Sequence, residues 1–275
     1  MASLTTAQGR AFQTYDFTSS YGEPALYAVA DNRVGAKDIP LVIVCHGAGG
    51  DYNEFTNSYP PLRDWIIDNG GAYVEARGAL KNWGSKKGVD AYRAAYDRVV
   101  SSLSVGPVAL VGISMGGLAA VNLYLNEPVI SARASGAAIL SGTADLVYRY
   151  NTGSPDDQAS LRAAYNAADT AAYMAAIKAY DPMQIPISKW AGKRVQHVVA
   201  DGDTAVVAKR HGIPLRRRIA TGAPAMNGMF VFPGGDHNST QLNAAATPAT
   251  TSFLAEVLGM NSRTVTSIRT NLPLS

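Results

Sequence analysis

The chain has little cysteine, little charge and no long apolar run, and each absence excludes a class of protein. Cys45 is the only cysteine among 275 residues, so no disulfide forms within the chain. Charged residues make up only 16% of the sequence and the formal net charge is +3, and no basic stripe interleaved with aromatics is present to bind a nucleic acid. No uninterrupted apolar run reaches the length of about 18 residues that a membrane span needs.

A secretory signal is also missing from the N-terminal segment. Residues 1–8 contain neither a basic n-region nor an apolar h-region. A cytoplasmic protein is therefore the default expectation, with delivery on a phage particle or release by lysis left open. Lys209, Arg210 and residues 216–218 form one basic cluster. We interpret it as a solvated helix face, with attraction for an acidic substrate as the alternative.

The pattern that is present is one of apolar runs alternating with amphipathic stretches. Apolar residues make up 47% of the chain, enough for one large domain over residues 1–275. The first clear central strand is expected at 41–45, and further strands are expected at 72–76, 107–111, 137–140, 195–199 and 229–232. Amphipathic helices are expected at 60–68, 92–103, 117–126 and 253–258. This alternation predicts an α/β fold whose mostly parallel sheet is covered by helices on both faces.

Two further segments stand outside this alternation. The early runs at 12–17 and 25–30 are expected to be edge strands. Residues 142–182 are rich in Ala, Asp and Tyr, show helical spacing and carry no central-strand signal, which predicts a helical lid inserted over the strand ends. The tyrosines of this insertion suggest an amphipathic cover for a site, with ordinary helix packing as the alternative; they are Tyr148, Tyr150, Tyr165, Tyr173 and Tyr180.

Residues 112–116, Gly-Ile-Ser-Met-Gly, form a G-x-S-x-G pattern between an apolar strand and an apolar helix. At such a junction the chain turns sharply, and the serine hydroxyl is exposed at the tip of the strand. Glycines on both sides let the backbone make this turn. The pattern at this place predicts that Ser114 is a nucleophile.

A nucleophilic serine needs a base, and the base needs a carboxylate to orient it. His237 lies in a glycine-rich turn directly after the last strand, so we expect it to be the base. His197, inside a strand, and His211, in the basic segment, are expected to be structural or exposed to solvent. Asp203, on the loop after 195–199, is the favoured orienting carboxylate, and Asp201 on the same loop is the alternative.

The glycine-rich loop 46–50, His-Gly-Ala-Gly-Gly, follows the first central strand. We expect a backbone N–H of Ala48 or Gly49, together with that of Met115, to form an oxyanion hole. The loop matches neither the P-loop nor the dinucleotide-binding pattern, so it is not interpreted as a phosphate site.

Taken together, these motifs resemble the α/β-hydrolase superfamily over residues 10–260. The motifs that match are His46-Gly47 with its following glycines, residues 112–116, the Asp203 loop and His237. The resemblance implies an eight-stranded, mostly parallel sheet and two-step acyl transfer without a metal or other cofactor. Within the superfamily the chain looks most like carboxylesterases, including esterase-like hydrolases of actinobacterial phages.

The resemblance predicts a serine carboxylesterase that hydrolyses small esters with short or medium acyl groups. His46, Asn82 and Trp83 are expected to line the substrate pocket. Three alternatives stay open: an esterase for mycolyl or other envelope esters, an acyltransferase, thioesterase or amidase using the same triad, and a non-catalytic binding protein. The sequence does not indicate an oligomeric state.

Overall fold

The computed structural model describes residues 1–237 and 239–260, with the side chains of 239–246 excepted. Nine strands form one sheet in the order β1-β2-β3-β5-β4-β6-β7-β8-β9. Their bounds are β1 (Ala2–Thr5), β2 (Ala11–Thr18), β3 (Pro24–Ala30), β4 (Ile39–Cys45), β5 (Ala72–Ala76), β6 (Val105–Ile113), β7 (Ala134–Leu140), β8 (Arg194–Ala200) and β9 (Met226–Phe232). All six of these predicted strands are present, several of them longer than expected, and β9 lies at the edge of the sheet.

The sheet is mixed rather than wholly parallel. Strands β5, β4, β6, β7, β8 and β9 are parallel to one another, whereas the pairs β1–β2, β2–β3 and β3–β5 are antiparallel. The expected count of eight strands was too low, because the four-residue segment Ala2–Thr5 gave no strand signal. Since β1 pairs with β2, neither β2 nor β3 is the edge strand that the sequence predicted.

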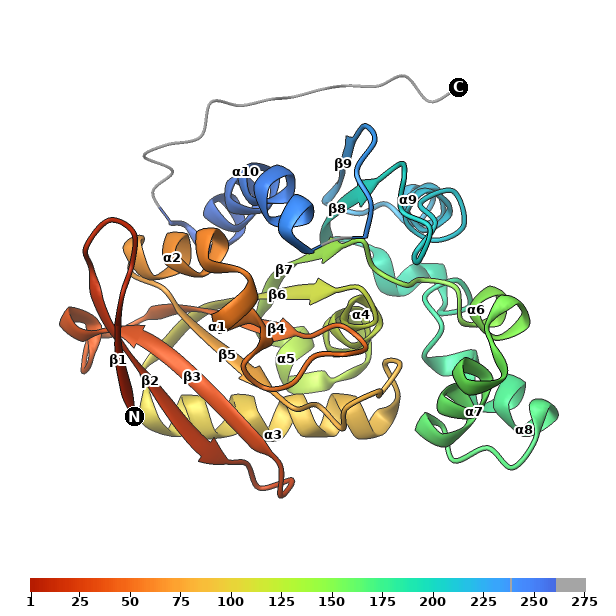
Figure 1. Cartoon of the computed structure of the whole chain (residues 1–275), viewed down its shortest axis with the longest axis horizontal. Helices are drawn as coiled ribbons and strands as arrows, with labels where there is room; N and C mark the ends of the chain where they lie inside the picture. Colours follow the sequence, from red (N-terminus) through yellow and green to blue (C-terminus); the bar gives the residue numbers. More distant parts are fainter. Residues whose placement is uncertain (238, 261–275) are drawn as a thin grey trace.

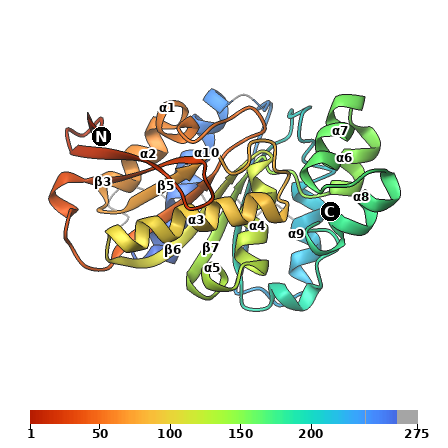
Figure 2. The same ribbon diagram turned by 90° about the horizontal axis from the view of Figure 1, so that it is seen from below.

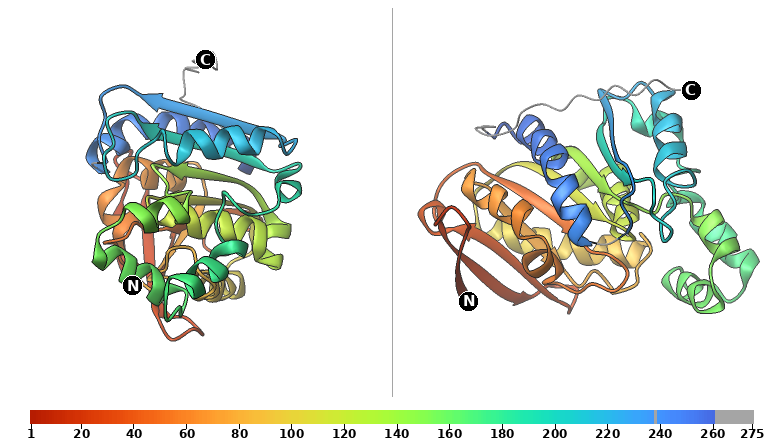
Figure 3. Two further views of the ribbon diagram at one scale, coloured as in Figure 1. Left: turned by 90° about the vertical axis from the view of Figure 1, so that its right-hand side faces the viewer. Right: turned by 45° about the horizontal axis from the view of Figure 1, so that its top comes forward.

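Helices cover both faces of the sheet, as predicted (Figure 1). Successive side chains of a strand point to opposite faces, so a continuous apolar strand such as β4 feeds two cores. Val42 and Val44 pack beneath α1 (Glu54–Ser58), α2 (Pro60–Asp68) and α10 (Ser239–Leu258). Leu41 and Ile43 belong to the core of the other face, which is covered by α3 (Lys86–Ser102), α4 (Gly116–Asn126) and α9 (Gly212–Ala220). Figure 3 shows α10 crossing its face of the sheet beside α2.

The predicted insertion 142–182 contains three short helices at one end of the sheet. They are α6 (Leu146–Thr152), α7 (Pro155–Ala164) and α8 (Thr170–Ala176), and Figure 2 shows them grouped beside the main body. Their side chains share a core with Trp83, Met115 and Leu118, which lie beyond the carboxyl ends of strands. Another short helix, α5 (Pro128–Arg133), starts at the proline that ends α4, and single 3-10 turns occupy Asp31–Arg33, Ile177–Ala179 and Ile187–Trp190.

The strand order reverses at β4, which has β5 on one side and β6 on the other. The loops after β4 and β6 therefore leave neighbouring strands at the same edge of the sheet. Crevices for ligands form at such reversal points in α/β sheets. This topology brings the glycine-rich loop 46–50 next to the serine at the end of β6.

Candidate active site

Ser114 occupies a sharp turn between β6 and α4. Its backbone has a φ of +53°, a left-handed conformation that is costly for a residue with a side chain. Three backbone hydrogen bonds hold it there: Ser114 N–H donates to Leu140 O, and Ser114 O accepts from Gly117 and Thr143 N–H. The strained turn directs the hydroxyl into the crevice at the strand end.

The two flanking glycines are required by close approach rather than by backbone torsion. A Cβ added to Gly116 would lie 2.0 Å from Cys45 O, and one added to Gly112 would lie 2.7 Å from Gly116 O. Both contacts involve backbone atoms, which cannot move aside as a flexible side chain can. The small residues thus allow α4 to start directly against the end of β4.

His237 lies between Ser114 and Asp203 and contacts both. Its Nε2 is 2.9 Å from Ser114 Oγ, and its Nδ1 is 2.7 Å from Asp203 Oδ2. The His237 side chain is 30% exposed, whereas that of Asp203 is 1% exposed. A buried carboxylate thus orients a ring that solvent and substrate can reach, which is the arrangement expected from the sequence.

The Asp203 carboxylate is kept ionised by its hydrogen bonds. Its Oδ1 accepts the N–H groups of Ala205 and Val206, both at 2.8 Å. Burial opposes ionisation, but the bonds from His237 and from the loop N–H groups outweigh it, so the pKa of Asp203 lies below its usual value. Asp201 instead accepts from Gly234 N–H at 2.6 Å and ties its loop to the one that carries His237.

The loop after β4 lies against Ser114. Ala48, Gly49 and Met115 all line the cavity around the serine hydroxyl. Within the described part of the chain, the N–H groups of Ala48 and Met115 donate to no other protein group. These donors remain available for an oxygen atom of a bound substrate.

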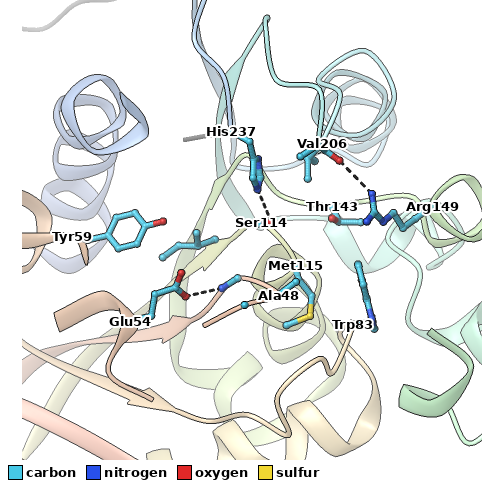
Figure 4. Close-up of a pocket in the computed structure, with 14 residues that line it drawn as sticks. Ala48, Glu54, Tyr59, Trp83, Ser114, Met115, Thr143, Arg149, Val206 and His237 are labelled. Carbon is cyan, nitrogen blue, oxygen red and sulfur yellow. Dashed lines mark hydrogen bonds between the residues drawn. The ribbon is translucent and has the colours of Figure 1, made fainter. Parts of the chain in front are cut away.

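The cavity around Ser114 has a volume of about 380 Å³, within the range usual for small-molecule sites. Figure 4 shows Glu54 and Tyr59 on one side of Ser114, and Trp83, Thr143 and Arg149 on the other. The other lining residues are Gly47, Ala48, Gly49, Ile113, Met115, Ala205, Val206 and His237.

Of the three expected pocket residues, only Trp83 lines the cavity. Asn82 is buried in the loop beside it, where its side chain donates to Gly78 O and accepts from Gly84 N–H. His46 is also buried, and its ring nitrogens face Gly47 O at 2.6 Å and Arg77 O at 2.7 Å. Both side chains hold loops in place, so their expected position in the pocket was wrong.

Four of the five tyrosines of the insertion pack against one another, and Tyr148 packs edge-on against His211, instead of covering the cavity. The rings of Tyr150 and Tyr173 are stacked with centroids 4.5 Å apart, and Tyr165 meets Tyr173 edge-on. The Tyr165 hydroxyl donates to Trp83 O. None of the five tyrosines lines the cavity, so ordinary helix packing is the correct interpretation of this pattern.

The remaining residues singled out in the sequence are mostly buried. Cys45 is fully buried, as expected, and burial raises the pKa of its thiol. His197 and His211 are buried as well, and burial is the main cause that lowers the pKa of each to about 4. In the basic cluster, Arg217 is exposed, whereas Arg218 donates to Ile185 O.

Six cavity residues were not revealed by the sequence: Glu54, Tyr59, Thr143, Arg149, Ala205 and Val206. Glu54 lies only four positions after Gly50, and that proximity to the glycine-rich loop was the one available signal. Arg149 reaches the cavity because α6 packs against Trp83 and Met115, a placement that no local pattern encodes. In the described part of the chain, no group of three or more His, Cys, Asp or Glu side chains is placed to hold a metal ion.

The fold and the site define a serine hydrolase of the α/β type. The chain belongs to the alpha/beta hydrolase family, whose profile matches residues 41–249. A search of curated proteins finds no match. None of the helices among the described residues has the length and apolar character to cross a bilayer.

Solved structures with a similar fold share little sequence with this chain. An S-formylglutathione hydrolase from Agrobacterium tumefaciens has a TM-score of 0.69 and 15% identity, over 94% of this chain and 100% of its own. The serine hydrolase FphF from Staphylococcus aureus has a TM-score of 0.66 and 13% identity, over 89% of this chain and 98% of its own. A puromycin-hydrolysing peptidase from Mycobacterium tuberculosis has a TM-score of 0.70 and 15% identity. The match covers 95% of this chain but only 41% of the peptidase. The chain likewise spans only 39% of a prolyl endopeptidase.

Proposed function

We propose that the protein is a carboxylesterase that hydrolyses small esters through an acyl-enzyme formed on Ser114. The observation that carries the proposal is the pair of contacts made by His237, at 2.9 Å to Ser114 Oγ and 2.7 Å to Asp203 Oδ2. A serine, a histidine and a buried carboxylate in this order form the triad in which the histidine acts as the base that activates the hydroxyl for attack on a carbonyl.

The reaction proceeds in two halves. In the first, Ser114 Oγ bonds to the ester carbonyl carbon while His237 Nε2 takes its proton. The tetrahedral oxyanion accepts the N–H groups of Met115 and of Ala48 or Gly49. It collapses as His237 protonates the leaving alcohol. In the second half, water gives a proton to His237, attacks the acyl carbon and releases the acid, and Ser114 regains its proton.

The size of the cavity supports short or medium acyl groups. A volume of about 380 Å³ suits a small ester, and charged Glu54 and Arg149 side chains on its walls do not suit a long alkyl chain. We further propose that α6, α7 and α8 act as a cap that limits this space, since their core includes Trp83 and Met115 from the cavity wall.

The test pairs chemical labelling with turnover. A fluorophosphonate probe should modify wild-type protein at Ser114, and p-nitrophenyl acetate and butyrate should be hydrolysed faster than long-chain esters. Ser114→Ala should fold normally, lose the label and lose at least about 10⁴-fold in kcat/KM. Labelling of a different residue, or substantial turnover by Ser114→Ala, would exclude the proposal. Matching anilides and thioesters in the same panel separate an esterase from an amidase or a thioesterase.

A further inference from the structure

The cavity around Ser114 carries two charged side chains on opposite sides, and only one of them has an ionic partner. The Arg149 guanidinium is paired with Asp157 at 2.9 Å and lies over the Trp83 ring, 5.4 Å from its centroid. Glu54 has no Lys, Arg or His nitrogen within 4.0 Å among the residues that the structure describes. The Glu54 side of the cavity is therefore the one with an uncompensated charge.

The Glu54 carboxylate is held in place but not saturated with hydrogen bonds. Its Oε2 accepts Gly47 N–H at 2.9 Å. A Cβ added to Gly50 would strike the carboxylate, so the glycine-rich loop wraps closely around it. An ionised carboxylate offers about four acceptor positions, and one neutral N–H leaves acceptors for a ligand.

Glu54 lies close to the nucleophile. A Cβ built on Gly47 would lie 3.5 Å from Ser114 Cβ and 3.7 Å from Glu54 Oε1, so the two side chains flank the same point of the loop. A group bound at Glu54 would be only a few bonds from a carbonyl under attack by Ser114.

Tyr59 completes this side of the cavity. It is 2% exposed and lines the same wall as Glu54 (Figure 4). Burial raises the pKa of the Tyr59 hydroxyl, and the negative charge of Glu54 raises it further, so the field of the carboxylate reaches the phenol. A carboxylate beside an aromatic side chain is a favourable environment for an ammonium group, whereas it repels an anion.

We propose that the Glu54 side of the cavity binds a cationic group, so that the preferred substrates are esters with an ammonium a few bonds from the scissile carbonyl. The inference rests on the proposed esterase activity. On the opposite side, Arg149 already covers the Trp83 ring and pairs with Asp157, so that side offers a cation no free partner and the substrate has one orientation over Ser114. The ammonium can belong to the acyl part or to the alcohol part of the ester, and the experiment tests each possibility with its own substrate pair.

The experiment compares each cationic ester with its neutral isostere. One pair is a p-nitrophenyl ester whose acyl chain ends in trimethylammonium, and the same ester ending in tert-butyl. The other pair is acetylcholine and 3,3-dimethylbutyl acetate, in which tert-butyl replaces trimethylammonium. For each pair, the kcat/KM of the cationic ester divided by that of the neutral ester reports charge recognition. A general loss of activity lowers both values and leaves this ratio unchanged. The enzymes are wild type, Glu54→Gln and Asp16→Asn, the last removing an exposed carboxylate on β2.

Wild type should prefer the cationic member of at least one pair by about tenfold or more, mainly through KM, and salt should weaken this preference. Glu54→Gln keeps an oxygen to accept Gly47 N–H but has no charge, so it should reduce the ratio about tenfold. Asp16→Asn should keep the wild-type ratio.

Three results would overturn the inference. A wild type that hydrolyses both members of each pair equally has no cation site. A Glu54→Gln enzyme that loses activity on both members equally would make Glu54 a positioning residue for the loop alone. Equal loss of preference in Asp16→Asn would point to the overall charge of the protein. Absence of ester turnover together with absence of fluorophosphonate labelling is different, because that result rejects the esterase proposal itself.

Discussion

Asp203 and His237 lie 34 positions apart in the sequence, and their side chains meet at 2.7 Å between Oδ2 and Nδ1. Asp201, two positions before Asp203, also contacts the loop that carries His237, but it accepts the backbone N–H of Gly234. The neighbouring carboxylates thus have different partners, one a histidine ring and the other the backbone that carries that ring.

Asp203→Asn should therefore lower kcat by about 10⁴-fold, because the amide no longer holds the imidazole in the tautomer that accepts the Ser114 proton. The fold should survive, since the remaining side-chain oxygen can still accept from Ala205 and Val206 N–H. Asp201→Asn is the matched control and should change kcat only a few-fold, as its oxygen still accepts from Gly234. Steady-state kinetics on p-nitrophenyl acetate measure both. Equal losses in the two variants would contradict the assignment of Asp203.

Gly116→Ala should destabilise the protein by roughly 3 kcal/mol or more, because the new Cβ would lie 2.0 Å from the backbone oxygen of Cys45. Gly49→Ala is the control for folding, as a Cβ there meets no atom within 4 Å. Urea unfolding followed by far-UV circular dichroism gives both free energies of unfolding. If Gly116→Ala proved as stable as wild type, α4 would not be packed against β4 as described.

Glu75 should make stability fall as pH rises. Burial raises its pKa from 4.5 to about 8, although Phe55 N–H and the N–H and hydroxyl of Thr56 donate to the carboxylate and oppose the shift. Between these two values the folded state keeps a proton that the unfolded state has released, so this contribution is complete below pH 4.5 and is lost as pH rises through about 8.

Glu75→Gln removes this titration. The stability of wild type relative to Glu75→Gln should therefore decrease between about pH 5 and about pH 9, by on the order of 1–4 kcal/mol. Urea unfolding at the two pH values measures it. A difference that stays constant with pH would show that Glu75 does not hold a proton in the folded state.

His211 should make stability fall as pH falls, in the acid range. Its pKa is lowered from 6.5 to about 4, mainly by burial and further by the charge of Arg149. In this window the unfolded state binds a proton and the folded state does not, so this stability is present above pH 6.5 and is lost as pH falls through about 4.

His211→Asn provides the comparison, because its side-chain oxygen can replace Nδ1 as the acceptor for Ala144 and Asp145 N–H. Wild type should lose on the order of 1–3 kcal/mol relative to this variant between about pH 7 and about pH 4. Thermal unfolding in matched buffers measures the loss, and parallel pH curves for the two proteins would contradict it.

Much of the fold could be predicted from local patterns. The strand 72–76 was placed to the residue, and the helix predicted at 60–68 has the bounds Pro60–Asp68, because apolar periodicity and a proline act within one element. Strand β1 was missed, since Leu4 is the only one of its four residues that is even partly buried and the strand is held by pairing with β2. Edge position also depends on pairing, which is why β2 and β3 were misplaced.

The candidate site divides in the same way. Residues 112–116 and 46–50 carry strong local signals, since a turn with such steric limits admits few residues. The order of serine, carboxylate and histidine along the chain then pointed to Asp203 and His237. The cavity wall was beyond the reach of sequence patterns: His46 and Asn82 turned out to hold loops, while Glu54 and Arg149 reach Ser114 from separate elements. A backbone turn depends on neighbouring residues along the chain, so the nucleophile and the glycine-rich loop could be predicted from the sequence. Which charges face a substrate depends on how distant elements pack, so the polarity of this cavity emerged only from the folded arrangement.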